Sequence, residues 1–419
     1  MTTKPSYTPA LRFPDFLNDG EWEVKRLGEI CIVNPPSKDI PEEFHYLDLE
    51  SVVAGRIIGC NRIKREGAPS RAQRLVQKYD VLFQMVRPYQ QNNLYFLLED
   101  GQYVASTGYA VLRAKEGVSD SGYLYHIVHS KDFLSQVLQR CTGSNYPAIN
   151  SSSLEDICVP FPPLSEQRRI AQALTALDEL IAATNERLEQ MKAYKKGLMQ
   201  QLFVDSMGGG KSLKINYLQI PKLRFPEFYE EKEWIYYNGD KMFEPIVNKN
   251  HNSDLPVLAI TQDQGAIPRD LIDYNVIVSD KSIEAYKVVE IGDFIISLRS
   301  FQGGIEYSKF KGLCSPAYIV LRKKSDDVCD DFYRYYFKSN QYIKDLNRNL
   351  EGIRDGKMVS YKQFSDIMIP CPKYEEQRKI ASCLSAMDET INACTEKVGL
   401  LGQYKKGLMQ QMFPQNQMN

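Results

Sequence analysis

The chain has 419 residues, of which 43% are hydrophobic and 25% are charged, and its formal net charge at pH 7 is −1. This length exceeds that of one ordinary core, so the chain is expected to form two or more domains of a soluble globular type. The near-zero net charge excludes a bulk attraction to nucleic acid, so any such site must be a local patch.

The chain also lacks the usual marks of export and membrane insertion. The stretch MTTKPSYTPALRFPDF at the N-terminus has no apolar core of a signal peptide. No apolar run approaches the ~20 residues that a membrane span requires. Nine scattered cysteines without a C-x-x-C pair suit reduced thiols better than disulfides or a zinc site. We therefore expect a cytoplasmic protein with no membrane association.

The front part of each half of the chain predicts a mixed α and β globule. Apolar and alternating runs predict strands at 79–86, 109–114, 293–300 and 317–324. Two amphipathic stretches predict helices at 122–140 and 330–349. Gly, Asn and Pro mark the turns between them. We expect a twisted, mainly antiparallel sheet in each globule.

One stretch of the first globule is a candidate basic patch. Residues 61–80 carry Arg62, Lys64, Arg65, Arg71, Arg74 and Lys78 against Glu66 and Asp80. Such a run is either a local nucleic-acid site or a solvated face. Composition alone favours the solvated face.

Three motif-like segments do not support catalysis or metal binding. Asn34-Pro35-Pro36-Ser37 is similar to the motif of adenine-N6 methyltransferases, but Ser37 replaces the aromatic residue that stacks on the flipped base. GGGKS at 208–212 lacks the earlier glycine of a P-loop, since Asp205 stands there, and is better interpreted as a linker. His126 and His129 have no third ligand nearby and are expected to be surface or core residues.

A long helix is predicted at the end of each half. Its apolar positions recur in steps of three and four, which is typical of a coiled-coil seam. Pro163 and Pro372 precede the two helices, Ser165 is a candidate N-cap, and Glu166 suits the positive end of the helix dipole. The seam positions, which also serve as candidates for partner docking, are Ile170, Leu174, Leu177, Ile181, Leu188, Met191, Leu198, Leu202, Ile380, Leu384, Met387, Ile391, Val398, Leu401, Leu408 and Met412.

Each helix has one narrow apolar stripe, and the other helix is its most economical partner. We predict an intramolecular antiparallel coiled coil; the alternative is that each helix packs on its own globule or on another chain. Lys195 and Lys405 interrupt the seam at matching places. A symmetric antiparallel register would place Lys195 near Asp388 and Lys405 near Asp178, whereas otherwise both lysines would extend to solvent.

Repeated segments show that the two halves are a duplication. A period of about 200 residues is far too long for a solenoid and indicates two similar halves with an approximate twofold relation. Gly197 and Gly407, inside the repeated octet, suggest the close approach of another backbone. The repeats are LRFPDF (11–16) and LRFPEF (223–228), STGYAVLR (106–113) and SPAYIVLR (315–322), EQRRIA (166–171) and EQRKIA (376–381), and YKKGLMQQ at both 194–201 and 404–411.

This combination closely resembles the specificity subunit of type I restriction–modification systems. The most specific segments are PFPPLSEQRRIAQALTALDELI, the two YKKGLMQQ octets and GDFIISLRSFQGGIEYSKFKGLCSPAY at 292–318. The resemblance implies an α+β fold with two target recognition domains and two conserved helices. The implied boundaries are 1–163 (first recognition domain), 164–203 (first helix), 204–222 (linker), 223–373 (second recognition domain), 374–413 (second helix) and 414–419 (tail).

The resemblance also implies function and partners. Each recognition domain would read one half of a split double-stranded DNA site, and the helices would set the spacing and dock two methyltransferase subunits. Motor-nuclease subunits would complete the complex. The chain itself would be non-catalytic and would bind no cofactor; its partners would use S-adenosylmethionine, and ATP with Mg²⁺ for cleavage.

The candidate DNA-reading residues follow the strands that open each site. Arg suits guanine, and Gln or Asn suits adenine, by bidentate hydrogen bonding. In the first half they are Arg87, Tyr89, Gln90, Gln91, Asn92, Asn93, Ser144, Asn145 and Tyr146. In the second half they are Arg299, Ser300, Phe301, Gln302, Gly303, Gly304, Arg354 and Lys357.

Two other functions remain open from the sequence. The chain could be a coiled-coil adaptor whose globules bind proteins without contacting DNA, or a stand-alone enzyme on a duplicated fold. Polar hairpin tips of no special function would account equally for the candidate loops.

Overall fold

The computed structural model of the chain describes residues 6–37, 39–99, 102–203, 221–231, 233–252, 254–272, 283–348 and 359–413. The fold divides into two compact units. The first unit contains residues 1–186 and 396–419, and the second contains residues 187–395. Each unit therefore combines the front part of one repeat with pieces of both long helices.

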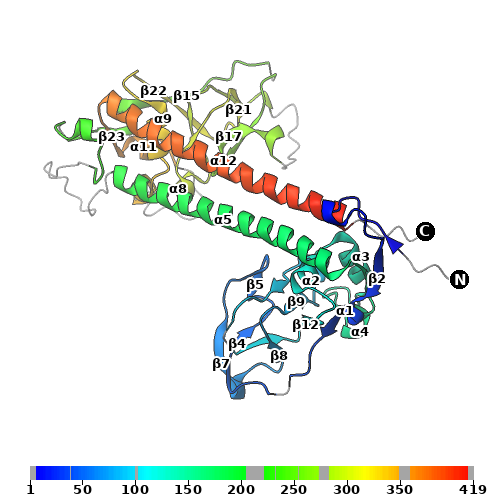
Figure 1. The fold of residues 1–419 in the computed structure, drawn as a ribbon. Coiled ribbons are helices and arrows are strands. Elements are labelled where there is room, and N and C mark those ends of the chain that lie inside the picture. Colours follow the sequence, from blue (N-terminus) through cyan, green and yellow to red (C-terminus); the bar gives the residue numbers. More distant parts are fainter. Residues whose placement is uncertain are drawn as a thin grey trace. The chain divides into compact units, whose positions relative to one another are not determined.

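The first unit is a mixed α/β structure built on short, mainly antiparallel sheets (Figure 1). Its strands are β1 Ser6–Tyr7, β2 Trp22–Arg26, β3 Cys31–Val33, β4 Glu43–Leu47, β5 Val52–Val53, β6 Arg56–Ile57, β7 Asn61–Lys64, β8 Ala72–Val76, β9 Val81–Gln84, β10 Leu94–Tyr95, β11 Tyr103–Ser106, β12 Tyr109–Ala114 and β13 Cys158–Phe161. Its helices include α1 Leu27–Ile30, α2 Ser121–Ile127, α3 Lys131–Arg140, α4 Ser151–Glu155 and the short 3-10 helices η1 Pro14–Phe16, η2 Arg65–Gly67 and η3 Pro88–Gln90.

The second unit has the same general construction. Its strands are β14 Ile235–Asn238, β15 Phe243–Ile246, β16 Leu258–Thr261, β17 Gly265–Pro268, β18 Lys287–Val289, β19 Phe294–Ile296, β20 Glu306–Tyr307, β21 Gly312–Cys314, β22 Ile319–Lys323 and β23 Met368–Cys371. Its helices include α6 Gly239–Met242, α8 Ser300–Gly303, α9 Asp330–Tyr336, α10 Asn340–Arg348, α11 Tyr361–Ser365 and the 3-10 helices η4 Pro226–Phe228 and η5 Arg269–Leu271.

Matched central sheets confirm the duplication. The first unit contains the order β10-β9-β12-β3, and the second contains β20-β19-β22-β15, all antiparallel. A buried aspartate accepts two hydrogen bonds from an arginine of the neighbouring strand in both: Arg113 to Asp80 at 2.8 and 2.7 Å, and Arg322 to Asp293 at 2.7 and 2.7 Å. The outer sheets differ. In the first unit β4 pairs in parallel with β11, whereas the described strand pairs of the second unit are antiparallel.

The two predicted helices of the globules are each broken in two. A continuous helix over 122–140 is wrong, because α2 ends at Ile127 and Ser130 starts α3 as its N-cap by accepting the N–H of Phe133. Ser339 caps α10 in the same way, so 330–349 is also not one helix. Serine competes for backbone hydrogen bonds and is favoured at such starts. The predicted strand at 293–300 ends early, since α8 begins at Ser300.

The two long helices are α5 Leu164–Leu202 and α12 Tyr374–Met412. Ser165 is not the N-cap as predicted, because α5 already begins at Leu164. Glu166 instead accepts two hydrogen bonds from Arg12, at 2.7 and 2.8 Å. Arg224 donates to Glu376 in the same manner, at 2.7 and 2.7 Å. These pairs fix the first turn of each long helix to the LRFP segment of its own repeat.

The end of each long helix belongs to the core of the other repeat. Met412 and Phe413 of the second repeat are buried in the first unit's core with Ile170 and Leu174. Leu202 and Phe203 of the first repeat are buried in the second unit's core with Ile380 and Leu384. Fully burying one such side chain stabilises a fold by ~1.5–3 kcal/mol. Leu198 and Met199 of the first octet, and Leu408 and Met409 of the second, pack partly buried against these two cores, so both octets fit similar cores, which is a physical reason for their identity.

The helix starts and ends pair in an antiparallel sense, as predicted. In the second unit Lys195 donates to Asp388, and in the first unit Lys405 donates to Asp178. The predicted seam positions are all buried or partly buried, whereas Leu180 and Leu400, just off the seam, are 45% and 57% exposed. These contacts confirm the coiled-coil seam and the lysine pairing.

The octet glycines have no close neighbour among the described residues, so close approach of a partner's backbone stays a prediction. A Cβ placed on Gly197 or Gly407 would meet no atom of the described residues within 4 Å, leaving aside its own turn of helix. Close approach of another part of this chain therefore does not explain these glycines.

Among the described helices, none combines the length and the apolarity of a membrane span.

Candidate nucleic-acid interface

The first candidate loop follows β9 and adopts an unusual backbone. Arg87 and Gln91 flank η3 with φ of 53° and 52°, the left-handed region that non-glycine residues seldom enter. The backbone N–H of Arg87 donates to Pro147 O at 2.7 Å. The Gln84 side chain donates to Gln90 at 2.8 Å and accepts from the N–H of Asn92 at 3.1 Å. The loop is thus held rigidly, and such strain is a recurrent feature of binding sites.

The second candidate loop of the first unit meets the first. Ala148 pairs with both Val86 and Thr142, so residues 142–148 form a small hairpin beside Arg87. The Arg87 guanidinium lies 4.3 Å from the centre of the Tyr146 ring. Tyr146 is 64% exposed and Tyr89 is 52% exposed. Two segments about 60 residues apart therefore present one arginine and two aromatic rings together, and Ser144 and Asn145 are exposed on the same hairpin.

Asn93, in contrast, is enclosed by the protein. It is 1% exposed, accepts the N–H of Gln84 at 2.8 Å and lies 3.3 Å from Nε2 of His129. Its side chain positions the loop and does not reach solvent. Gln91 and Asn92 are partly exposed, and Gln90 is exposed.

The candidate loop of the second unit forms α8 after β19. Arg299 and Gln302 are exposed, and Phe301 is partly buried against the core. Ser300 is 1% exposed and accepts the N–H of Ser297 at 2.8 Å. Gly304 has a φ of 82°, and a Cβ there would lie 2.0 Å from Phe337 O, so only glycine fits.

The exposed arginine and glutamine are therefore the side chains that α8 offers to a ligand. Gly303 is partly exposed. Arg354 and Lys357 lie outside the described residues.

A lysine that the sequence argument missed supports the loop of the second unit. Lys338 Nζ donates to Gly303 O at 2.9 Å and to Gln262 O at 3.2 Å, and it pairs with the buried Glu306. Burial raises the pKa of Glu306, which Lys338 partly offsets. Lys338 lies just after α9 and 35 residues from Gly303, so the sequence around Lys338 gives no indication of this contact.

The two histidines are core residues, as one of the sequence interpretations held. Burial lowers the pKa of His126 and of His129, so both imidazoles are neutral near pH 7. His126 Nε2 lies 3.1 Å from Thr175 Oγ1, and His129 Nδ1 donates to Tyr125 O at 2.7 Å. Within the described ranges, no cluster of His, Cys, Asp and Glu could hold a metal ion.

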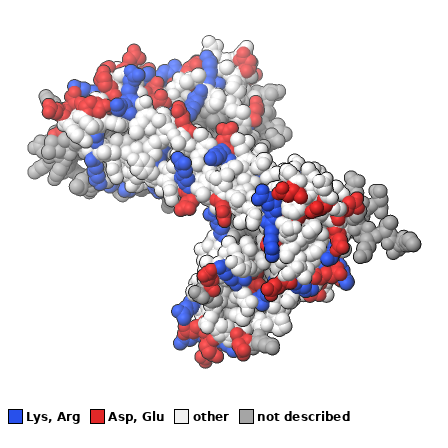
Figure 2. All heavy atoms as spheres, in the orientation of Figure 1, with Lys and Arg blue, Asp and Glu red and all other residues white. Residues whose placement is uncertain are grey.

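The remaining sequence motifs have structural roles or are exposed to solvent. Asn34 of the NPPS segment donates to Ser151 at 2.8 Å and accepts the N–H of Val111 at 3.0 Å, so it connects the start of α4 to β12. In the basic stretch 61–80, Arg62 pairs with Glu43 and Lys78 pairs with Glu99, as expected of a solvated face. Residues 208–212 lie outside the described part. On the face drawn in Figure 2, Lys and Arg alternate with Asp and Glu.

Comparisons with known proteins agree with this architecture. The profile of the family "Type I restriction modification DNA specificity domain" matches residues 19–193 and again residues 227–398. The type I restriction enzyme MjaVIII specificity subunit of Methanocaldococcus jannaschii is 24% identical over 426 residues, which cover 95% of this chain and 92% of the relative.

Two solved structures share the fold. The type I restriction-modification system S subunit from M. genitalium superposes with a TM-score of 0.58 at 15% identity, covering 97% of this chain and 99% of that one. A chain from a study of complex assembly and conformational transition of a type I R-M system superposes with a TM-score of 0.54 at 22% identity, covering 94% and 98%.

Proposed function

Because the chain belongs to the type I restriction–modification DNA specificity family, we propose that it reads a bipartite DNA target, with one half-site for each recognition domain. Its relatives are the non-catalytic specificity components of such systems. The observation that carries the proposal is the repeated position of an arginine-bearing loop, in which Arg299 is exposed and Arg87 is partly exposed. Arg87 follows β9 and Arg299 follows β19, and these two strands occupy matching places in the two central sheets.

The loops supply suitable chemistry for base recognition. An arginine guanidinium donates two parallel hydrogen bonds to guanine, and glutamine or asparagine pairs with adenine in the major groove. The first unit offers Arg87 with Gln90, and the second offers Arg299 with Gln302. The two loops differ otherwise, since Tyr89 is 52% exposed whereas Phe301, at the matching place in the second loop, is partly buried against the core. The two half-sites should therefore differ in sequence.

The long helices suit identical partners. Tyr194 and Gln201 recur as Tyr404 and Gln411, and all four are exposed. Each copy would dock one of two identical methyltransferase subunits, and motor-nuclease subunits would join them. The partners would bind S-adenosylmethionine, and ATP with Mg²⁺. Base flipping and methyl transfer need a closed pocket, which the partners would supply.

A mobility shift with and without the methyltransferase partner tests this function against the alternatives. The full chain with its partner should bind duplex DNA with an affinity that falls steeply with salt. A protein-binding adaptor would join the partner without shifting DNA. Methylation or hydrolysis by the purified chain alone would instead support a stand-alone enzyme.

A further inference from the structure

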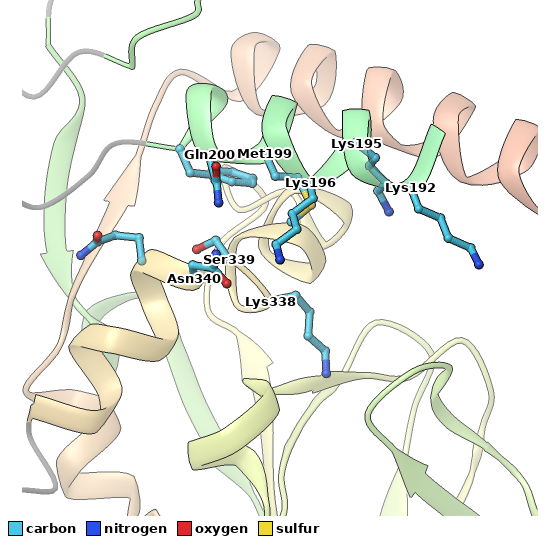
Figure 3. Close-up of a pocket in the computed structure, with 10 residues that line it drawn as sticks. Lys192, Lys195, Lys196, Met199, Gln200, Lys338, Ser339 and Asn340 are labelled. Atoms are coloured by element: carbon cyan, nitrogen blue, oxygen red, sulfur yellow. The ribbon is translucent and has the colours of Figure 1, made fainter. Parts of the chain in front are cut away.

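A groove in the second unit is lined by positive charge. It lies between the last turns of α5 and the turn that leads into α10. Lys196 extends from α5 toward the turn that carries Lys338, Ser339 and Asn340 (Figure 3). The fourth charged residue of the groove is Lys192. Among the described residues, no Asp or Glu belongs to the lining.

Only part of this charge is neutralised by the protein. Lys195 pairs with Asp388, and Lys338 pairs with Glu306. Among the described residues, Lys192 pairs only with Glu189, one turn earlier on the same helix, at 2.8 Å; the two side chains are 49% and 70% exposed. Lys196 has no ion pair or hydrogen bond to any described side chain. A single unpaired surface lysine is ordinary, but this one recurs in the other unit in similar surroundings.

The first unit repeats the arrangement. Lys406 and Gln410 of the second octet line a larger groove, as Lys196 and Gln200 line the first, and Lys131 at the start of α3 faces the same hollow. Neither Lys406 nor Lys131 pairs with a described residue. Four basic residues and two acidic residues line this groove, and Lys405 forms an ion pair with one of the acidic residues, Asp178. The basic residues are Arg56, Lys131, Lys405 and Lys406, and the other acidic residue is Glu179.

Each groove is connected to a candidate reading loop, directly in the first unit and through Lys338 in the second. Gln90 and Gln91 of the first loop belong to the lining of the first unit's groove. In the second unit, Lys338 of the groove donates directly to Gly303 O of α8. The major groove of DNA is ~12 Å wide, so phosphates on its edge pass close to any loop that reaches the bases. This connection favours DNA over a protein as the occupant.

We propose that Lys196 and Lys406 bind backbone phosphates beside each half-site, with Gln200 and Gln410 as neutral donors. The proposal rests on the proposed function, since it takes the adjacent loops to face DNA. A lysine ammonium is a point charge on a flexible stem, which suits phosphate and carries no sequence information. The octets are then identical partly because both contact the part of DNA that does not vary.

The test uses the full chain in complex with its methyltransferase partner. Lys196→Gln, Lys406→Gln and the double variant are compared with Lys397→Gln, an exposed lysine of α12 that lines neither groove. Glutamine is nearly as good a helix former as lysine, so folding should not change. Binding to the target duplex and to a scrambled duplex is measured by fluorescence anisotropy over a series of salt concentrations.

Each groove substitution should reduce the slope of log affinity against log salt by about 0.9, which near 0.1 M salt is a loss of about eightfold. The loss should be equal for the two duplexes, and the methylated sequence should stay the same. A slope and affinity equal to those of Lys397→Gln would overturn the proposal. So would loss of partner association at unchanged DNA affinity, which would make the groove a protein-docking face. Neither of these results would affect the reading of half-sites by the loops, which a changed recognition domain tests separately.

Discussion

The buried ion pair between Arg224 and Glu376 makes the most demanding prediction about stability. The two side chains are 5% and 1% exposed and share two hydrogen bonds of 2.7 Å. Glu376→Gln keeps the size of the side chain and removes the carboxylate that the guanidinium faces. The positive charge would then remain in an interior where water cannot replace the lost anion.

The expected cost is ~3–5 kcal/mol, the range for breaking a buried ion pair by removing one partner. Charge-assisted hydrogen bonds of ~1.5–3 kcal/mol each give a similar total. The matched control is Lys379→Ala, which breaks the Lys379–Glu227 pair at 2.9 Å on the same part of α12. Those side chains are 51% and 45% exposed, so the control should cost no more than ~1 kcal/mol.

Urea unfolding followed by tryptophan fluorescence separates the two units. The chain has one buried tryptophan in each, Trp22 and Trp234. In a Trp22→Phe background the signal reports the second unit, and Glu376→Gln should lower its midpoint by about 1–2 M urea at a slope of about 2–3 kcal/mol/M. A midpoint shift as small as that of Lys379→Ala would refute the reasoning.

Three further predictions follow from the contacts. Lys195→Glu should destabilise the second unit by ~1–3 kcal/mol, and adding Asp388→Lys should restore part of that stability. If the effects of the two substitutions simply added in a double-mutant cycle, the Lys195–Asp388 pairing would be contradicted. Because burial lowers the pKa of His126 below 6.5, the unfolded chain binds a proton that the folded chain does not, and the first unit should lose stability as pH falls below 6.5. Tyr335 occupies the matching position in the second unit, so His126→Tyr should reduce this loss of stability between pH 7.5 and pH 5, measured by urea titration. An unchanged loss would mean that another group causes it. Arg87→Ala should relax base preference at one position of one half-site by ~1–3 kcal/mol in competition with base-substituted duplexes, whereas equal weakening on every duplex would indicate a phosphate contact.

Features with a repeated or periodic pattern could be predicted from the sequence. The heptad spacing led to the antiparallel pair of α5 and α12, and the lysines inside the seam led to their aspartate partners. These predictions succeeded because helix geometry relates sequence spacing directly to position on a face. The matched segments likewise led to two similar globules.

Contacts between distant residues that lie outside the helical seam could not be predicted in this way. Arg12 meets Glu166 across 154 residues, and Arg224 meets Glu376 across 152, although the repeated LRFP and EQR segments marked both partners. The breaks at Ser130 and similar caps were missed because helical periodicity continues through them. Burial of candidate site residues such as Asn93 depends on which strands pack around the loop, and local sequence does not contain that information.

The central claim is that each recognition domain reads its own half of the target. The direct measurement replaces residues 223–373 with the matching segment of a relative of known target and maps the methylated adenines produced by the reconstituted complex. The account predicts that one half-site changes to that of the relative while the other half-site stays the same. A change in both halves, or in neither, would contradict it.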